Sequence, residues 1–215
     1  MIRLYDYWRS SAAYRVRVAL HLKGVEFETV QINILPGADE QLGERYRVIN
    51  PQMRVPSIEV DGRIAGQSMA IIEWIDETVP GPALLPRDPW QRLQARAFAD
   101  IIACDIHPLN NLSPLAVLRR DFGADEGAIK RWYQDWILRG FAALETMAVE
   151  VDRGEFLFGD TPGLAEIALV PQVANARRFD TDLSAFPRLV ALDAACLELE
   201  AFRRAAPENQ PKPVS

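Results

Sequence analysis

Cysteine and histidine are scarce in this chain of 215 residues, and their scarcity excludes several kinds of site. The two cysteines, Cys104 and Cys196, form no CxxC pair, so we expect neither a disulfide framework nor a zinc site. The two histidines, His21 and His107, are too few for a histidine-based metal centre. Two isolated cysteines favour a reducing compartment. We therefore expect a cytoplasmic protein without a bound metal.

Long apolar runs and excess positive charge are also absent. No run approaches the roughly 18 apolar residues that span a bilayer, and residues 1–11 lack the features of a signal peptide. The formal net charge of −6 argues against nucleic acid or an anionic membrane as a partner. What remains is the ordinary composition of a globular protein with a sizeable core.

The first 80 residues alternate between strand and helix patterns. Ile2 to Trp8 alternates as a strand does, and Ser10-Ser11 introduces a helical repeat that Gly24 ends. The following segments are a strand over 27–34, a looser helical stretch over 40–48, strands over 57–60 and 63–65 joined by an Asp61-Gly62 turn, and a helix from Gln67-Ser68. A βαβ unit followed by a ββα unit predicts a four-stranded mixed sheet, the α+β thioredoxin-like fold.

Prolines mark the end of this domain. Residues 80–89 contain four prolines and a glycine, which indicates a stiff linker. Beyond it the periodicity is helical, over 90–118 with breaks or bends at Pro108 and Pro114, and over 124–152, 164–178 and 187–205. We expect a thioredoxin-like domain over 1–80, a linker over 81–89, an all-helical domain over 90–207 and a flexible tail over 208–215.

Three short motifs could together hold a small thiol peptide. Arg9-Ser10-Ser11 begins a helix, where N–H groups and hydroxyls stabilise a thiolate, although serine is also a common helix cap. Val55-Pro56 in the cis form would expose the Val55 backbone to an extended peptide, whereas trans is the ordinary form. Gln67-Ser68 could hold a carboxylate at a helix N-terminus, or Ser68 could simply cap that helix. Because the three motifs fall at loop ends that converge on one side of such a sheet, they predict a glutathione site.

A second polar set lies in the helical region. His107, Asn110 and Asn111 surround Pro108 and could line a polar wall, although a histidine satisfied by backbone carbonyls is the alternative. Arg177-Arg178 could bind a substrate carboxylate bidentately. At least one of these two arginines is expected to be solvated at the end of the helix instead of binding the substrate.

The chain resembles the zeta-class glutathione transferases, the group that includes maleylacetoacetate isomerase and maleylpyruvate isomerase. The resemblance covers almost the whole chain and rests on the motifs YDYWRSSAAYRVRVALHLKG, NPQMRVPSIEVDG, GQSMAIIEWI, CDIHPLNNLSPL, FGDTPGLAE and LVPQVANARRF. It implies a homodimer and glutathione-dependent cis–trans isomerisation of a maleyl keto acid. In that reaction an activated thiolate adds to a cis double bond conjugated with a carbonyl and leaves after the bond rotates.

The resemblance also assigns residues. It places Ser10 and Ser11 beside the glutathione sulfur, without deciding which of them activates the thiol. It matches Gln41, Val55, Gln67 and Ser68 to the positions that hold the glutathione backbone and γ-glutamyl end, and Arg9, His107, Asn111 and Arg178 to the polar wall near the sulfur and the small acidic substrate. Beside these matches we expect Pro56 at the glutathione site and Asn110 at the substrate, with Arg9 also a catalytic residue and with His107 and Asn111 also contacts of glutathione.

Departures from the family pattern keep other functions open. Ala12 replaces the family's cysteine, Tyr14 stands at its aromatic position, and Ser113 lies where many bacterial relatives carry an arginine. Gly163 replaces the serine or threonine of the family's later capping box. Conjugation or peroxidase chemistry at the same sulfur, and a non-catalytic glutathione-binding protein, are the alternatives. Thiol–disulfide exchange is disfavoured because the helix start has no cysteine.

Overall fold

A computed structural model describes residues 1–151 and 154–212, which form two compact units. One unit combines residues 1–84 with the chain from Leu197 onward, and the other spans Leu85–Cys196. The second unit ends earlier than the helical domain expected over 90–207. The expected assignment of glutathione binding to one unit and substrate binding to the other remains a prediction.

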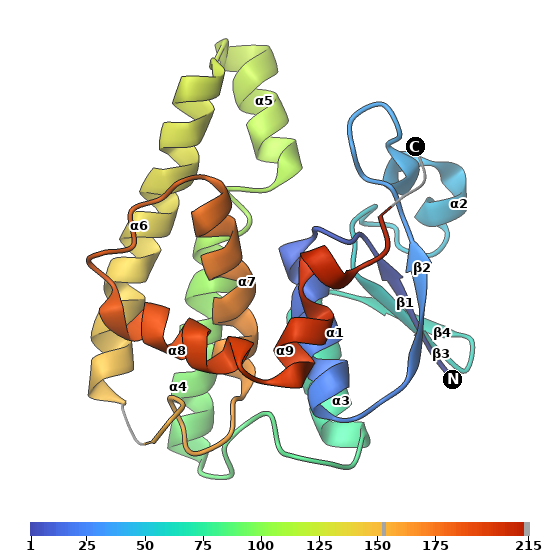
Figure 1. The fold of residues 1–215 in the computed structure, drawn as a ribbon. Helices are drawn as coiled ribbons and strands as arrows, with labels where there is room; N and C mark the ends of the chain where they lie inside the picture. Colours follow the sequence, from blue (N-terminus) through green and yellow to red (C-terminus); the bar gives the residue numbers. More distant parts are fainter. Residues whose placement is uncertain (152–153, 213–215) are drawn as a thin grey trace. The chain divides into compact units, whose positions relative to one another are not determined.

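The first unit contains a four-stranded sheet of order β2-β1-β3-β4, shown in Figure 1. Its strands are β1 (Ile2–Asp6), β2 (Phe27–Gln31), β3 (Ser57–Val60) and β4 (Arg63–Gly66). β2 runs parallel to β1, whereas β3 is antiparallel to both β1 and β4. The predicted hairpin turn is present, with positive φ angles of 50° at Asp61 and 77° at Gly62. The thioredoxin-like sheet is therefore confirmed.

Helices α1 (Ser11–Leu22) and α3 (Ser68–Thr78) pack against each other in this unit. Two short pieces, η1 (Glu40–Leu42) and α2 (Glu44–Arg47), occupy the stretch predicted as loosely helical. Ten of the twelve residues of α1 are buried, because α9 (Glu200–Ala205) also packs against this helix. A 3₁₀ turn, η3 (Pro207–Asn209), follows α9, and residues 213–215 of the expected tail lie outside the described residues.

The single helix predicted over 187–205 is wrong. The structure has α8 (Pro187–Leu197) and α9 as separate helices. Leu199 adopts an extended conformation, with φ −83° and ψ 133°, and ends the helical path between them. Neither glycine nor proline marks this break in the sequence.

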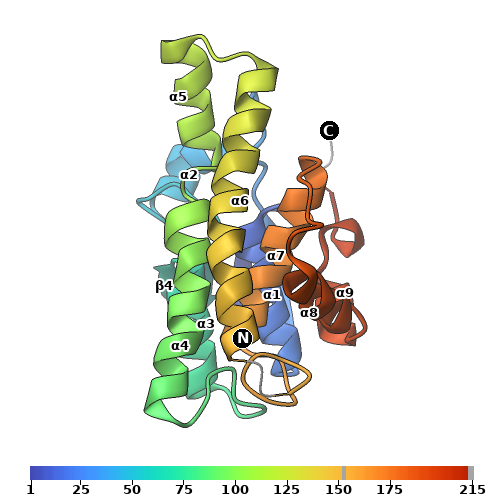
Figure 2. The ribbon, with the colours of Figure 1, turned by 90° about the vertical axis from the view of Figure 1, so that its left-hand side faces the viewer.

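The second unit is a helical bundle, seen from another side in Figure 2. Its remaining elements are α4 (Pro89–Asp100), the π-helix η2 (Ile101–Ile106), α5 (Leu112–Phe122), α6 (Glu126–Glu150) and α7 (Leu164–Arg178). α7 is almost entirely buried and packs against α4 and η2. The helix predicted over 90–118 is interrupted at residues 107–111, which include Pro108. Asp152, the last residue of the helix predicted over 124–152, lies outside the described residues.

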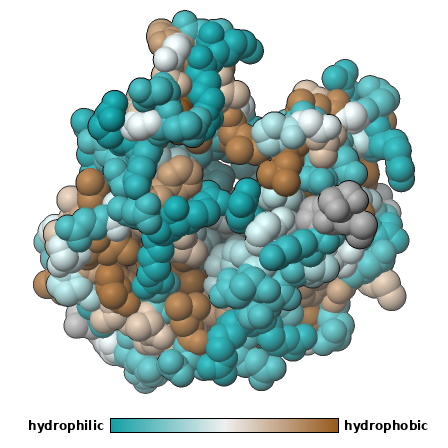
Figure 3. Space-filling model, turned by 45° about the horizontal axis from the view of Figure 1, so that its top comes forward, coloured by the Kyte–Doolittle hydropathy of each residue, from teal (hydrophilic) through white to brown (hydrophobic). Residues whose placement is uncertain are grey.

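The surface and the helix lengths complete the description. Polar residues dominate the face in Figure 3, with the hydrophobic residues in separate patches. Within residues 1–151 and 154–212, no helix combines the length and apolar character needed to cross a bilayer.

Candidate active site

The sheet register brings the three predicted motifs to one edge of the first unit. Tyr5 pairs with Ser57, and Ser57 pairs with Gly66. The chain leaves β1 just after Tyr5, enters β3 at Ser57 and leaves β4 at Gly66. The loop before α1, the Val55-Pro56 step and the start of α3 therefore lie at the same edge.

Ser10 is the N-cap of α1, and its side chain is polarised by that role. Its Oγ accepts a hydrogen bond of 3.2 Å from the backbone N–H of Ala13. The hydroxyl proton donates to no residue of the described chain, and the N–H of Ala12 also finds no acceptor there. Ser11 is the first helical residue and is only 8% exposed. The loop thus presents a free O–H and a helix N-terminus, both of which stabilise an anion.

The Val55-Pro56 peptide bond is cis. Asn50 Nδ2 and the Tyr46 hydroxyl donate to the carbonyl of the preceding residue, Arg54, at 2.7 and 2.9 Å, and so fix the backbone next to this peptide bond. No hydrogen bond to the backbone N–H or C=O of Val55 is present in the described chain. These two groups can therefore pair with an extended peptide as a neighbouring strand would.

The start of α3 has unsatisfied N–H groups. Gln67, rather than Ser68, is the N-cap, so the expected capping role of Ser68 is wrong. Gln67 has a positive φ of 72° and its side chain donates to Gln52 instead of capping the helix. In the described chain, the N–H groups of Ser68 and Met69 have no acceptor. This helix end is open to a carboxylate.

Ser68 has a buried partner that the sequence analysis missed. Arg15, on α1, is 1% exposed and donates to Ser68 Oγ at 3.4 Å. A charged side chain is seldom fully buried without polar partners. Two arginines in the otherwise apolar stretch of α1, Arg15 and Arg17, were the signal that could have revealed such contacts.

Two further predicted residues belong to the same unit. Gln41 lies in η1, and its buried Oε1 accepts no hydrogen bond from the described residues. Arg9 is exposed, with its guanidinium 5.3 Å from the centre of the Trp8 ring. The Lys212 amine lies 5.2 Å from the same ring centre, so two cations flank Trp8. The loop before α1 is therefore positively charged.

The predicted polar set of the second unit follows the π-helix. The backbone N–H of His107 donates to the carbonyl of Ile102, five residues earlier, as π-helical geometry requires. Asn110 is buried, and its Nδ2 donates to the carbonyl of Tyr133 at 3.1 Å while its Oδ1 has no partner in the described chain. Asn111 caps α5 through Oδ1, which accepts from Leu112 at 2.7 Å.

Tyr133, on α6, connects this set with Arg178 and was missed by the sequence analysis. Arg178 Nη2 lies 3.5 Å from the Tyr133 hydroxyl, and its guanidinium lies 5.0 Å from the ring centre of Phe179. The Tyr133 and Phe179 rings are stacked with their centroids 3.6 Å apart. Burial raises the pKa of Tyr133, although Arg178 opposes this, so the phenol stays neutral. No sequence signal distinguished Tyr133 from an ordinary core tyrosine.

The two neighbouring arginines at the end of α7 have different environments. Arg177 forms a 2.6 Å ion pair with Asp193, whose side chain is 1% exposed. Arg178 is exposed and has no carboxylate partner among the described residues. Only Arg178 is therefore available to an acidic ligand.

Comparisons with known proteins agree with this geometry. Residues 9–78 match the glutathione S-transferase, N-terminal domain. The maleylpyruvate isomerase of a Ralstonia species is 50% identical over 211 residues, which cover 98% of this chain and 99% of the relative.

Solved structures extend the match to the whole fold. One is a holo structure of a maleylpyruvate isomerase, described as a bacterial zeta-class glutathione S-transferase. It has a TM-score of 0.93 at 50% identity, and the match covers 97% of this chain and 98% of the chain in that structure. A maleylacetoacetate isomerase of Anaeromyxobacter dehalogenans with bound dicarboxyethyl glutathione and citrate has a TM-score of 0.84 at 41% identity, covering 98% and 93%. The chain therefore belongs to the glutathione S-transferase family, and within it to the zeta class of maleylpyruvate and maleylacetoacetate isomerases.

Proposed function

We propose that this protein is a glutathione-dependent cis–trans isomerase of a maleyl keto acid, either maleylpyruvate or maleylacetoacetate. One observation carries the proposal: at one edge of the sheet in the first unit lie a serine hydroxyl proton, a backbone segment and a helix N-terminus that have no partner among residues 1–151 and 154–212. These groups match the thiol, the extended backbone and a carboxylate of glutathione. The relatives named above support the reaction class.

Glutathione is held, in this proposal, by groups most of which have no hydrogen-bond partner among the described residues. Val55 pairs with its peptide backbone, next to Pro56. Ser68 and the helix start after Gln67 bind the γ-glutamyl carboxylate, and the Gln41 side chain oxygen accepts from the tripeptide. The buried Arg15 lies behind Ser68 and adds positive charge at that end.

Ser10, rather than Ser11, is the proposed donor to the thiolate. A hydroxyl that already accepts a hydrogen bond is a stronger donor, because hydrogen bonds polarise one another. Ser10 accepts from Ala13 and keeps its proton free, whereas Ser11 is buried and has an interaction of its own. Ala12, where the family has a cysteine, contributes only its backbone N–H.

Cationic and amide groups are proposed to bind the acidic substrate. Arg9 and Arg178 are exposed cations, and each is by itself suited to a carboxylate of the substrate. His107, Asn110 and Asn111 are proposed as polar contacts for glutathione or the substrate, with Asn111 limited by its role as a helix cap.

Bound glutathione supplies a thiolate that adds to the cis double bond and leaves again once that bond has rotated. The chain's own groups must stabilise negative charge on the sulfur before addition and on the substrate's carbonyl oxygen after it. Ser10 and the start of α1 serve the first charge, and the substrate-binding cations hold the carboxylates in register. The dicarboxyethyl glutathione in the Anaeromyxobacter enzyme carries a dicarboxylic group on glutathione, as such addition would give.

The decisive experiment is an isomerisation assay with both maleylpyruvate and maleylacetoacetate. We expect the absorbance of the cis acid to convert to that of the trans acid only when glutathione is added, with no net consumption of glutathione. Arg178→Lys should raise the KM for the acidic substrate, because lysine is a point charge that cannot bind a carboxylate bidentately.

The same assay distinguishes the alternatives. Isomerisation without glutathione would contradict the proposal. Consumption of glutathione with a chlorinated aromatic or a hydroperoxide, but no isomerisation, would favour transferase or peroxidase activity. Glutathione binding without turnover of any of these substrates would favour a non-catalytic protein.

A homodimer is proposed on the basis of exposed apolar residues on α4. Trp90 and Leu93 are 65% and 52% exposed, and their spacing places both on one face of the helix. Large exposed apolar side chains on one face are typical of association surfaces. We expect sedimentation velocity to give twice the chain mass of 24.2 kDa, and Leu93→Glu to give the monomer.

The control for this prediction is Leu138→Glu on α6. Leu138 is also partly exposed, at 38%, but it lies away from α4 in the sequence and should leave the dimer intact. A monomeric wild-type chain, or a dimeric Leu93→Glu variant, would contradict the assignment. The cytoplasm remains the proposed location, because Cys104 and Cys196 form no disulfide bond in the described chain.

A further inference from the structure

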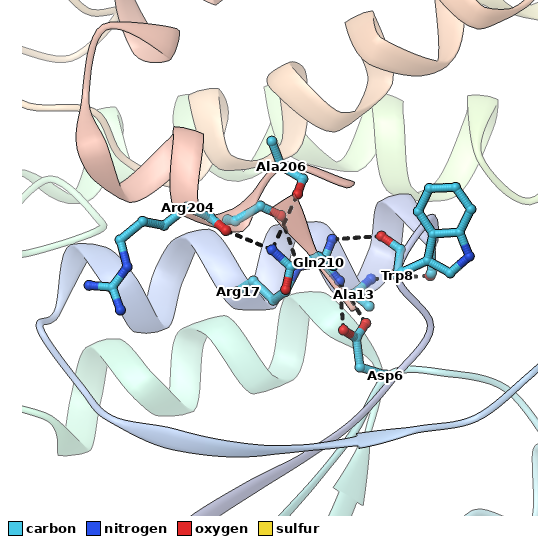
Figure 4. A network of polar contacts seen from close by, with 9 residues as sticks. Asp6, Trp8, Ala13, Arg17, Arg204, Ala206 and Gln210 are labelled. Atoms are coloured by element: carbon cyan, nitrogen blue, oxygen red, sulfur yellow. Dashed lines mark hydrogen bonds and ion pairs between the residues drawn. The ribbon is translucent and has the colours of Figure 1, made fainter. Parts of the chain in front are cut away.

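A fully buried arginine lies at the centre of a polar network in the first unit, shown in Figure 4. The Arg17 and Asp6 side chains are both 0% exposed, and Arg17 Nη1 contacts the two carboxylate oxygens of Asp6 at 2.7 and 2.8 Å. Asp6 is the last residue of β1. Arg17 is thus bound to β1, the strand that precedes the loop carrying Ser10.

The other nitrogens of Arg17 bind two backbone carbonyls. Nη2 donates to the carbonyl of Trp8 at 3.1 Å, and Nε donates to the carbonyl of Ala205 at 2.9 Å. Ala205 is the last residue of α9, where helix carbonyls lack intrahelical partners. One guanidinium therefore joins β1, the loop before α1 and the C-terminal helix.

The Trp8 carbonyl belongs to the turn that places Ser10. The N–H of Ser10 donates to the carbonyl of Tyr7 at 2.8 Å, which closes a turn from Tyr7 to Ser10 around Trp8. Rotation of the Trp8 peptide would displace Ser10, because only Arg9 separates the two residues. The bond from Arg17 opposes that rotation.

The C-terminal segment is itself held at this point. Gln210 Nε2 donates to the carbonyls of Arg204 and Ala206 at 2.6 and 3.2 Å, on either side of Ala205. In Figure 4 the Gln210 side chain lies beside Arg17. Three consecutive carbonyls at the end of α9 are thus bound, the middle one by Arg17.

We propose that Arg17 is a positioning residue for thiol activation, through which the C-terminal helix sets the geometry of the loop that carries Ser10. The proposal rests on the proposed function, because it assumes that Ser10 donates to glutathione. Arginine suits this role because its planar fork presents five donors in fixed directions. Lysine keeps the charge and can still contact Asp6, but one nitrogen cannot also bind both carbonyls in the same geometry.

The test is the pKa of the thiol of bound glutathione, measured from thiolate absorbance as a function of pH at saturating glutathione. Arg17→Lys should raise that pKa by about one unit, which lowers the thiolate population and kcat at lower pH about tenfold. The affinity for glutathione should change little, because the groups proposed to bind its backbone and carboxylate are untouched. Gln210→Ala should raise the thiol pKa in the same direction by a smaller amount.

Two comparisons make the outcome decisive. Arg3→Lys is the matched control, since Arg3 lies on β1 and forms ion pairs with Glu28 and Glu59 but does not bind the loop. Its thiol pKa should equal that of the wild type. If Arg17→Lys does not fold, Gln210→Ala decides the question. A lower melting temperature with an unchanged thiol pKa would assign Arg17 a purely structural role and overturn the proposal.

The design separates this proposal from the proposed function. If the wild type does not bind glutathione or does not lower its thiol pKa, the proposed function fails. If the wild type does both and the variants match it, only the positioning role fails. If thiol activation depends on Arg17 but neither maleyl acid is isomerised, the positioning role stands and the substrate assignment is wrong.

Discussion

Replacing Ser10 is expected to lower kcat about a hundredfold, the usual cost of removing one donor to a developing anion. Ser10 also caps α1, so the substitution has a structural effect that must be separated from the catalytic one. Alanine at an N-cap costs typically about 1 kcal/mol of stability, whereas glycine costs only a few tenths. Ser10→Ala and Ser10→Gly should therefore lose activity equally while differing in stability.

Two further variants complete this prediction. Ser10→Thr keeps both the hydroxyl and the capping acceptor and should retain most of the activity. Ser11→Ala should lose much less than Ser10→Gly, because Ser11 is nearly inaccessible. Steady-state kinetics and urea unfolding of the four variants give the answer. A hundredfold loss in Ser11→Ala with an active Ser10→Gly would transfer the donor role to Ser11.

The sequence predicts helix bounds well where the signals are local. The helix expected over 164–178 is observed as α7 with the same bounds. Its start is marked by Gly163 and by Glu166 three residues later, and its end by a pair of arginines. The turn at Asp61-Gly62 and the helix end at Gly24, with φ of 66°, are equally local.

Breaks that depend on tertiary packing are not predictable in this way. The π-helix at 101–106 lies where Ile106 crosses Gly140 of α6, at which an added Cβ would come within 2.3 Å of Ile106 Cδ1. The close approach requires a glycine far away in the sequence. The extended conformation of Leu199 similarly allows α9 to reach α1, a contact between distant segments.

The same distinction applies to the candidate site. The motifs at Ser10, Val55 and Gln67 were recognisable because each combines a turn or helix signal with a polar group. The partners of Arg17 and Tyr133 were not recognisable, because they lie far away in the sequence: Ala205 is 188 residues from Arg17. Local patterns thus predict which groups can meet a ligand, but not which groups hold them in place.

Glu166→Ala is expected to produce the largest loss of stability, about 4 kcal/mol. Glu166 is 1% exposed and accepts two backbone hydrogen bonds, from Leu157 at 2.8 Å and Gly163 at 2.9 Å. Each buried N–H left without an acceptor costs about 1–3 kcal/mol. Glu166→Gln keeps one acceptor oxygen and should lose about half as much. Urea unfolding at fixed protein concentration measures both, and losses below about 1 kcal/mol in Glu166→Ala would contradict the assignment.

Burial also gives Glu166 a pH dependence that the glutamine variant lacks. Burial raises the pKa of this carboxyl above its ordinary value of 4.5, and the hydrogen bonds from Gly163 and Leu157 oppose the rise without reversing it. Between 4.5 and the raised value, the folded chain binds more protons at this site than the unfolded chain, so unfolding free energy falls as pH increases. The contribution of Glu166 is therefore fully present below the ordinary pKa and is lost as pH rises through the folded one. The stability advantage of the wild type over Glu166→Gln should shrink across this window, and an advantage that grows with pH would show that the two backbone donors outweigh the cost of burying the charge.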